Sequence, residues 1–274
     1  MGLEALVAAA RQVRTSSAPA VLEDIRVLKP YIARGDGPHV VELRVTHSLT
    51  REEGLDCTLL SRLVDGTETD HLRARVTFPA HARPSVTPTR AGSSCMPIGR
   101  CMADGAAVYD LYFHGPSFQV VGGFEFQGDE MVCRLRQRLP PSHRGRSGDS
   151  YTAPCLIEFG LQCAGLLELA VSGRMMIPHS IARIDRFLAL EADHPGHLWS
   201  IARFASGERF DEGRPHEFDS RPGVDVDILD GHDRLVLRIN QYRTAPLPFA
   251  VNQAAAARLR TELLRSERRV ISPS

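Results

Sequence analysis

The sequence predicts an α+β fold in which antiparallel sheets each wrap a long helix. Two helical segments support this: an Ala- and Leu-rich run over Leu3–Val13 and an apolar run over 154–171. The segments around them mix β-branched and aliphatic residues with Arg, Glu or Thr, which is typical of antiparallel strands with one wet face. Such a sheet and an apolar helix bury one face of each against the other.

The order of a helix followed by strands occurs twice along the chain. Leu3–Val13 holds no Gly or Pro and has high helix propensity. The strands expected after it cover approximately 20–28, 39–46, 55–64 and 72–78. A Pro-, Ser-, Gly- and Arg-rich segment over 80–99 then predicts a linker. We therefore expect two domains, residues 1–95 with the linker and residues 96–274 with a C-terminal helix.

The second domain has strands both before and after its helix. We expect the strands at 117–126, 131–139, 175–187, 198–204, 224–229 and 235–242, and a terminal helix with a charged outer face over 252–269. The first domain begins almost at its helix, so it lacks the N-terminal strands that a repeat of the second would have. Either the chain is shortened at its start, or a partner or a second copy of the chain supplies them.

One carboxylate stands out in the long apolar helix. Pro154 at the first turn favours a helix, and helical spacing puts Glu158 and Gln162 on one face. A buried carboxylate is costly to ionise, so its pKa rises and it can keep a proton near neutral pH, as a general acid must. The alternative is that Glu158 reaches solvent or a buried Arg and serves only solubility.

The composition excludes several functions. The formal net charge is zero, which argues against nucleic acid as a partner. No uncharged apolar run of about 18 residues occurs and the N-terminus lacks a signal peptide, so we expect no membrane span and a cytoplasmic protein. The cysteines lack CxxC spacing, which predicts reduced core residues and no metal site or cofactor; they are Cys57, Cys95, Cys101, Cys133, Cys155 and Cys163.

Several motifs, taken together and in order, resemble the dehydratase domains of polyketide synthases and of related synthases for polyunsaturated fatty acids and enediynes. Phe113–Phe118 (FHGPSF) is similar to the family's Tyr, optional His, Gly, Pro, any residue, Phe. Pro154–Gln162 is similar to its Pro-x-Leu-x-Asp-x-x-x-Gln helix, and Met176–Ile181 to its Leu-Pro-x-Ser-Ile strand. Gly2–Ala5 is more weakly similar to the start of its first helix. The resemblance implies a double hotdog fold.

The resemblance also implies an activity in polyketide or specialised fatty-acid biosynthesis: removal of water from a 3-hydroxyacyl thioester on the phosphopantetheine of an acyl carrier protein. Glu158 stands at the position of the catalytic acid. The substrate-binding candidates are Gln162, Tyr109, His114, Gly115 and Pro116. Each has a plainer interpretation: Gln162 satisfies nearby backbone, Tyr109 and His114 pack at a strand edge, and Gly115-Pro116 forms a turn.

The departures from the family pattern leave other functions open. The family's base is a His in a His-x-x-x-Gly-x-x-x-x-Pro motif, and none of the 11 histidines has Gly four and Pro nine residues later. Glu158 replaces an Asp, and Phe113 replaces a Tyr. The alternatives are a catalytically silent relative that binds acyl chains or carrier protein, and an isomerase or cyclase that uses the same pocket.

Overall fold

The computed structural model describes eleven stretches of the chain. They are residues 2–15, 20–31, 40–49, 53–63, 65–79, 102–127, 129–136, 152–187, 197–205, 222–247 and 252–268. The linker predicted over 80–99 lies outside them, as do Cys95 and Cys101.

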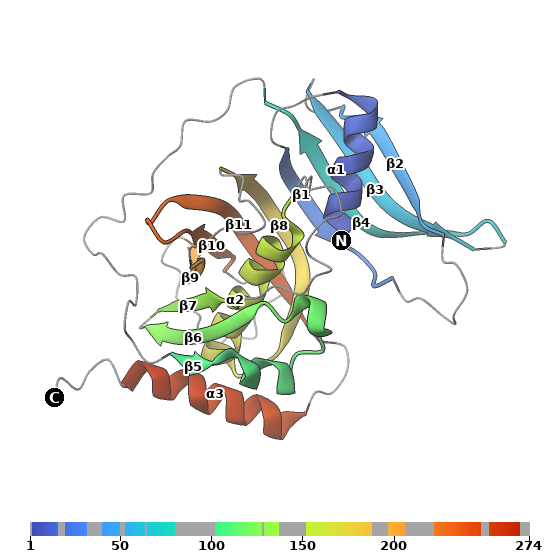
Figure 1. Cartoon of the computed structure of the whole chain (residues 1–274). Coiled ribbons are helices and arrows are strands. Elements are labelled where there is room, and N and C mark those ends of the chain that lie inside the picture. The colour runs from blue at the N-terminus through green and yellow to red at the C-terminus, as the bar shows by residue number, and fades with distance from the viewer. Residues whose placement is uncertain are drawn as a thin grey trace.

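Within these stretches, eleven strands form one antiparallel sheet in the order β2-β3-β4-β1-β8-β11-β10-β9-β7-β6-β5 (Figure 1). The elements are α1 (Gly2–Val13), β1 (Val21–Val27), β2 (Glu42–His47), β3 (Gly54–Arg62), β4 (Glu68–Thr77), β5 (Ala103–Asp104), η1 (Gly105–Asp110), η2 (Pro116–Phe118), β6 (Val121–Gln127), β7 (Glu130–Leu135), α2 (Pro154–Ser172), β8 (Met176–Arg186), β9 (Trp199–Phe204), β10 (Val224–Leu229), β11 (Leu235–Pro246) and α3 (Gln253–Arg268). The sheet is open, with β2 and β5 at its edges.

The two halves of the sheet meet where β1 pairs with β8. Ile25 of β1 lies opposite Ile181 of β8, and Leu22 lies opposite Ile184, so the joint is apolar on its inner face. On one side of the joint, α1 packs on β2, β3 and β4; on the other, the strands β6 to β11 contact α2 (Figure 1). The predicted mixture of helices and antiparallel strands is confirmed. In the described residues, the strands of the first half all follow α1, as the sequence indicates.

The long helix begins and ends where its sequence predicts. Pro154 is its first residue, which suits a position whose backbone nitrogen needs no helical acceptor. After the last turn, Gly173 adopts φ 69° and its N–H donates to Leu169 O at 2.9 Å, a common helix end. Arg260 of α3 also donates to the carbonyl groups of Ala170 and Val171. The helix therefore has satisfied backbone groups at its C-terminal end.

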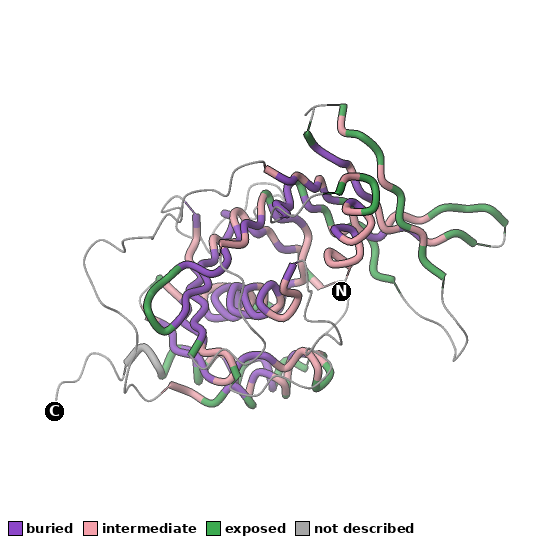
Figure 2. Tube along the Cα trace, turned by 45° about the horizontal axis from the view of Figure 1, so that its top comes forward, coloured by how far each residue is buried: buried purple, intermediate pink, exposed green. Residues whose placement is uncertain are grey.

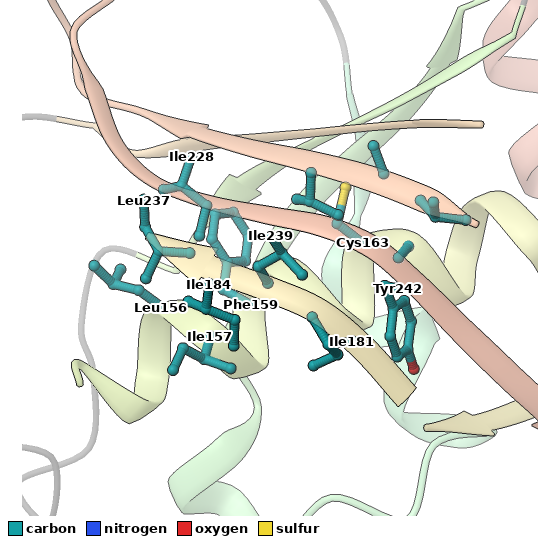
Figure 3. Packing of buried hydrophobic residues seen from close by; sticks show 14 of the residues in the cluster. Leu156, Ile157, Phe159, Cys163, Ile181, Ile184, Ile228, Leu237, Ile239 and Tyr242 are labelled. Carbon is teal, nitrogen blue, oxygen red and sulfur yellow. The ribbon is translucent and has the colours of Figure 1, made fainter. Parts of the chain in front are cut away.

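The core surrounds α2 on several sides (Figure 2). Phe159 and Cys163 of α2 are fully buried and lie among aliphatic side chains of β8, β10 and β11 (Figure 3). Gly160 permits close contact with the sheet, since a Cβ there would lie 2.8 Å from Ile239 Cδ1. Burying each Leu, Ile or Phe stabilises the fold by about 1.5–3 kcal/mol relative to exposure. By length and composition α2 could also cross a membrane, but its burial is that of a core helix.

The structure corrects three details of the predicted elements. The strand expected over 117–126 begins only at Val121, because Pro116 starts the short 3-10 helix η2. β11 continues to Pro246 rather than ending at Tyr242. β5 pairs with β6 but has only two residues, too few for a periodic signal. Among the described cysteines, Cys57, Cys133 and Cys163 are free and buried, and Cys155 is free and half-buried, as predicted.

Candidate active site

Glu158 and Gln162 lie on one face of α2, at successive turns from its start. The side chain of Glu158 is 25% exposed, whereas Gln162 is 2% exposed. The pair thus runs from the interior at Gln162 to an accessible edge at Glu158. Both side chains face the segment between η1 and β6, which contains His114 and Phe118.

Two donors converge on one oxygen of Glu158. Nε2 of His114 lies 2.9 Å from Glu158 Oε1, and Nε2 of Gln162 donates to the same oxygen at 3.0 Å. Oε2 has no hydrogen-bond partner among the described residues. The carboxyl group is therefore fixed by one oxygen, and the other is available to a bound molecule.

Gln162 is itself held by two further groups. Its Nε2 donates to Phe118 O at 2.8 Å, and its Oε1 accepts from the Tyr109 hydroxyl at 2.9 Å. That hydroxyl in turn accepts from the backbone N–H of Val121 at 2.7 Å. Burial raises the pKa of Tyr109, so the hydroxyl keeps its proton. A continuous chain of hydrogen bonds thus fixes Glu158 to β6.

His114 is held between aromatic rings. Phe113 stacks on it with ring centroids 5.3 Å apart and an interplanar angle of 10°, and Tyr112 is tilted at 5.7 Å. The backbone carbonyl of His114 accepts from Gln119 Nε2 at 3.2 Å. Phe113 is 72% exposed, so its ring faces outward. A Tyr at this position would carry its hydroxyl on that outward-facing ring.

The ionisation of Glu158 differs from the expectation. Burial raises its pKa, but the hydrogen bond and charge of His114, with the hydrogen bond from Gln162, outweigh burial. The pKa of Glu158 consequently lies below its ordinary value of 4.5. The prediction that Glu158 keeps a proton near neutral pH is wrong. The helical pattern around Glu158 could not reveal His114, which lies in the segment before β6 and lowers the pKa. An ionised carboxylate is a base rather than an acid.

Glu158 and His114 line a cavity of about 410 Å³ at the joint between the two halves. The cavity wall comes from the first turn of α1, from β1, β4 and β8, from the segment before β6, and from the start of α2. Most of it is apolar. The lining residues are Gly2, Leu3, Glu4, Ile25, Val27, Leu72, His114, Phe118, Thr152, Pro154, Ile157, Glu158, Leu161, Pro178 and Ile181. Its size and lining are those of a site for a small organic ligand.

The predicted site residues divide into two groups. Glu158, Gln162, Tyr109 and His114 are in one hydrogen-bonded network, but only Glu158 and His114 line the cavity. Gly115 and Pro116 form the exposed turn into η2 and lie outside the lining. Their plainer interpretation as a turn is the one that the structure shows.

Sequence reasoning missed a second carboxylate in the cavity. Glu4, in the first turn of α1, accepts from the backbone N–H of Thr152 at 2.8 Å and also from the Thr152 hydroxyl. This contact joins α1 to the chain just before α2. The first-turn position of Glu4 was visible in the sequence, but its distant partner was not. Among the described residues, no group of His, Cys, Asp or Glu side chains has the arrangement of a metal site.

Comparison with known protein families finds a match over the second half of the chain. A family model described as "Polyketide synthase dehydratase N-terminal domain" matches residues 101–254, a range that contains both His114 and Glu158. No curated protein sequence matches the chain.

Solved structures share the fold over most of the chain. A trans-AT PKS dehydratase domain from Brevibacillus brevis has 16% identity and a TM-score of 0.68, covering 90% of this chain and 84% of that one. The dehydratase domain of RzxB from Pseudomonas fluorescens has 14% identity and a TM-score of 0.65, covering 89% and 84%. The dehydratase domain of PpsC from Mycobacterium tuberculosis has 17% identity and a TM-score of 0.64, covering 90% and 82%. The fold is a double hotdog with an open sheet.

Proposed function

Because the chain belongs to the family of polyketide synthase dehydratase domains, we propose that it removes water from a 3-hydroxyacyl thioester carried on the phosphopantetheine arm of an acyl carrier protein. One observation carries the proposal: an ionised carboxylate, Glu158, lines an apolar cavity and has only one of its oxygens engaged. The apolar wall suits an acyl chain. The free oxygen suits proton transfer at a carbon next to the thioester.

The lowered pKa sets the role of Glu158 in this reaction. Loss of water begins with removal of the weakly acidic proton at C2, which needs a base close to that carbon. Glu158 is ionised and fixed by Gln162 and His114, so it meets this need. The resemblance alone implied the opposite role, an acid that protonates the leaving hydroxyl.

Incubation of the purified protein with a 3-hydroxyacyl carrier protein, followed by mass spectrometry, tests the proposal. We expect the wild type to release one water per acyl chain and Glu158→Gln to be slower by about 10²–10⁴-fold, the usual contribution of a positioned base. Glu262→Gln is the matched control, since it makes the same change on the exposed face of α3. No water loss from the wild type overturns the dehydratase proposal. Binding of the unchanged thioester would then identify a catalytically silent acyl-chain binder.

The ionised state of Glu158 also favours a second candidate, a double-bond shift. Here the carboxylate takes a proton from C4 of a 2-enoyl thioester and returns it to C2, so the double bond moves and no water is lost. NMR of a 2-enoyl thioester incubated with the protein in D2O tests this candidate. Deuterium at C2 together with a 3-enoyl product supports it, and an unchanged substrate excludes it.

A further inference from the structure

Dehydration needs a proton donor as well as a base, because hydroxide is a poor leaving group. Among the residues that line the cavity, the ionisable side chains besides Glu158 are His114 and Glu4. Glu4 accepts hydrogen bonds from Thr152, a contact that joins two segments of the fold. His114 lies on the cavity wall beside Glu158 itself.

We propose that His114 is the catalytic proton donor, and that it forms with Glu158 an acid–base dyad contained within the second half of the chain. This inference rests on the proposed dehydratase function. It assigns the histidine role of the reaction to a residue that follows η1.

An anionic side chain and two aromatic rings surround the imidazole of His114. Glu158 supplies an anionic partner 2.9 Å away, and the rings of Phe113 and Tyr112 lie within 6 Å of the imidazole. Both a carboxylate and an aromatic face at this range attract a cation. Nδ1 is buried with no hydrogen-bond partner among the described residues. Among the described residues, Glu158 is therefore the one hydrogen-bond partner of the His114 ring.

Other ionisable groups near the dyad are few in the described residues. Glu4 faces the same cavity from α1, and the Tyr109 hydroxyl lies behind Gln162. Arg136, which follows β7, donates to Gln119, the residue that also binds the backbone of His114.

The dyad accounts for every proton in the reaction. Oε2 of Glu158 takes the C2 proton, and the electron pair of that C–H bond forms the C2=C3 double bond. The C3–O bond breaks, and the departing hydroxide takes the proton of His114 Nε2, which gives up its hydrogen bond to Glu158 Oε1, to become water. Oε2 of Glu158 then releases its proton to water and Nε2 of His114 takes one up from water, which both side chains can reach at 25% and 20% exposure. The products are an enoyl thioester and water, and both residues recover their starting charges.

His114→Gln separates proton donation from positioning. The amide nitrogen of Gln can still donate a hydrogen bond to Glu158, but it carries no proton that a leaving hydroxide can remove. We expect water loss to fall by about 10²–10⁴-fold. The decline in rate on the alkaline side of the wild-type pH profile should also disappear. His232→Gln, on the exposed turn after β10, is the control with the same substitution. A rate for His114→Gln within about threefold of wild type overturns the proposal and leaves the dehydratase function standing.

A second measurement does not depend on turnover. Carbon-13 NMR of the Glu158 carboxyl group follows its titration in the folded protein. Since His114 lowers the pKa of Glu158, that pKa should be higher in His114→Gln than in the wild type. An unchanged titration overturns the dyad. If the titration differs between the two proteins but the wild type releases no water, the contact between His114 and Glu158 is supported and the dehydratase function is refuted.

Discussion

Nε2 of His114 lies 2.9 Å from Oε1 of Glu158, which joins the segment before β6 to the start of α2. Gln162 donates to the same oxygen. This arrangement lowers the pKa of a carboxyl group that burial alone would raise. The site therefore depends on a contact between two segments rather than on the apolar helix by itself.

The stability that Glu158 contributes should depend on pH. Its folded-state pKa lies below the ordinary 4.5, so this contribution is present above the unfolded-state pKa and is lost as pH falls through the folded-state pKa. Urea unfolding of the wild type and Glu158→Gln should show a larger difference in the free energy of unfolding at about pH 7 than at about pH 3. A difference that grows in acid would contradict the lowered pKa.

Tyr109 and Gln162 should be energetically coupled. Tyr109→Phe removes the acceptor for the Val121 N–H and the donor for Gln162 Oε1. Leaving such buried groups unpaired costs about 1–3 kcal/mol. In a double-mutant cycle with Gln162→Leu, the two losses should fall short of additivity by at least 0.5 kcal/mol, as is typical of residues in one network. Additive losses in urea unfolding would show that the two side chains act independently.

Gly165 on α2 leaves room for the hydroxyl of Tyr112. A Cβ at Gly165 would lie 2.6 Å from that oxygen but 3.6 Å from the ring carbon that carries it. We expect Gly165→Ala to lower the free energy of unfolding by about 1–3 kcal/mol through overpacking. Adding Tyr112→Phe removes the clashing atom and should recover part of the loss in thermal or urea unfolding. A double variant less stable than Gly165→Ala would refute this steric explanation.

Glu4 should hold α1 against the residues before α2. Glu4→Ala removes the acceptor for both the backbone N–H and the hydroxyl of Thr152. The expected cost is about 1–3 kcal/mol for the groups left unpaired. Hydrogen exchange followed by mass spectrometry should show faster exchange in α1 and at the start of α2, while β9 and β10 keep their protection. Thr152→Val, which removes only the hydroxyl, should have a smaller effect. Uniform acceleration across all strands would indicate general destabilisation instead.

The sequence predicts the elements of this fold better than the contacts between them. Glu158 and Gln162 could be placed on one helical face because their spacing is local. The contact of His114 with Glu158 could not, since it depends on how the turn at Gly115 returns the chain toward α2. Glu4 escaped notice for the same reason: its partner Thr152 lies far along the chain. The pKa of Glu158 was mispredicted because its direction is set by the distant donor.

The position of His114 and Gln162 on a single oxygen of Glu158 has a stereochemical consequence. In the proposed dyad, base and acid are the free oxygen of one carboxyl group and the nitrogen bound to its other oxygen. Because they belong to one hydrogen-bonded pair, we expect them to act on the same face of the acyl chain, so that the hydrogen at C2 and the hydroxyl at C3 leave from the same side. The test uses a substrate of known configuration at C3 with deuterium at one C2 position, and an NMR assignment of the double bond as cis or trans. Mass spectrometry should show loss of the label from the C2 position that same-side elimination to that double bond requires, and its retention at the other; the reverse result would contradict the proposal.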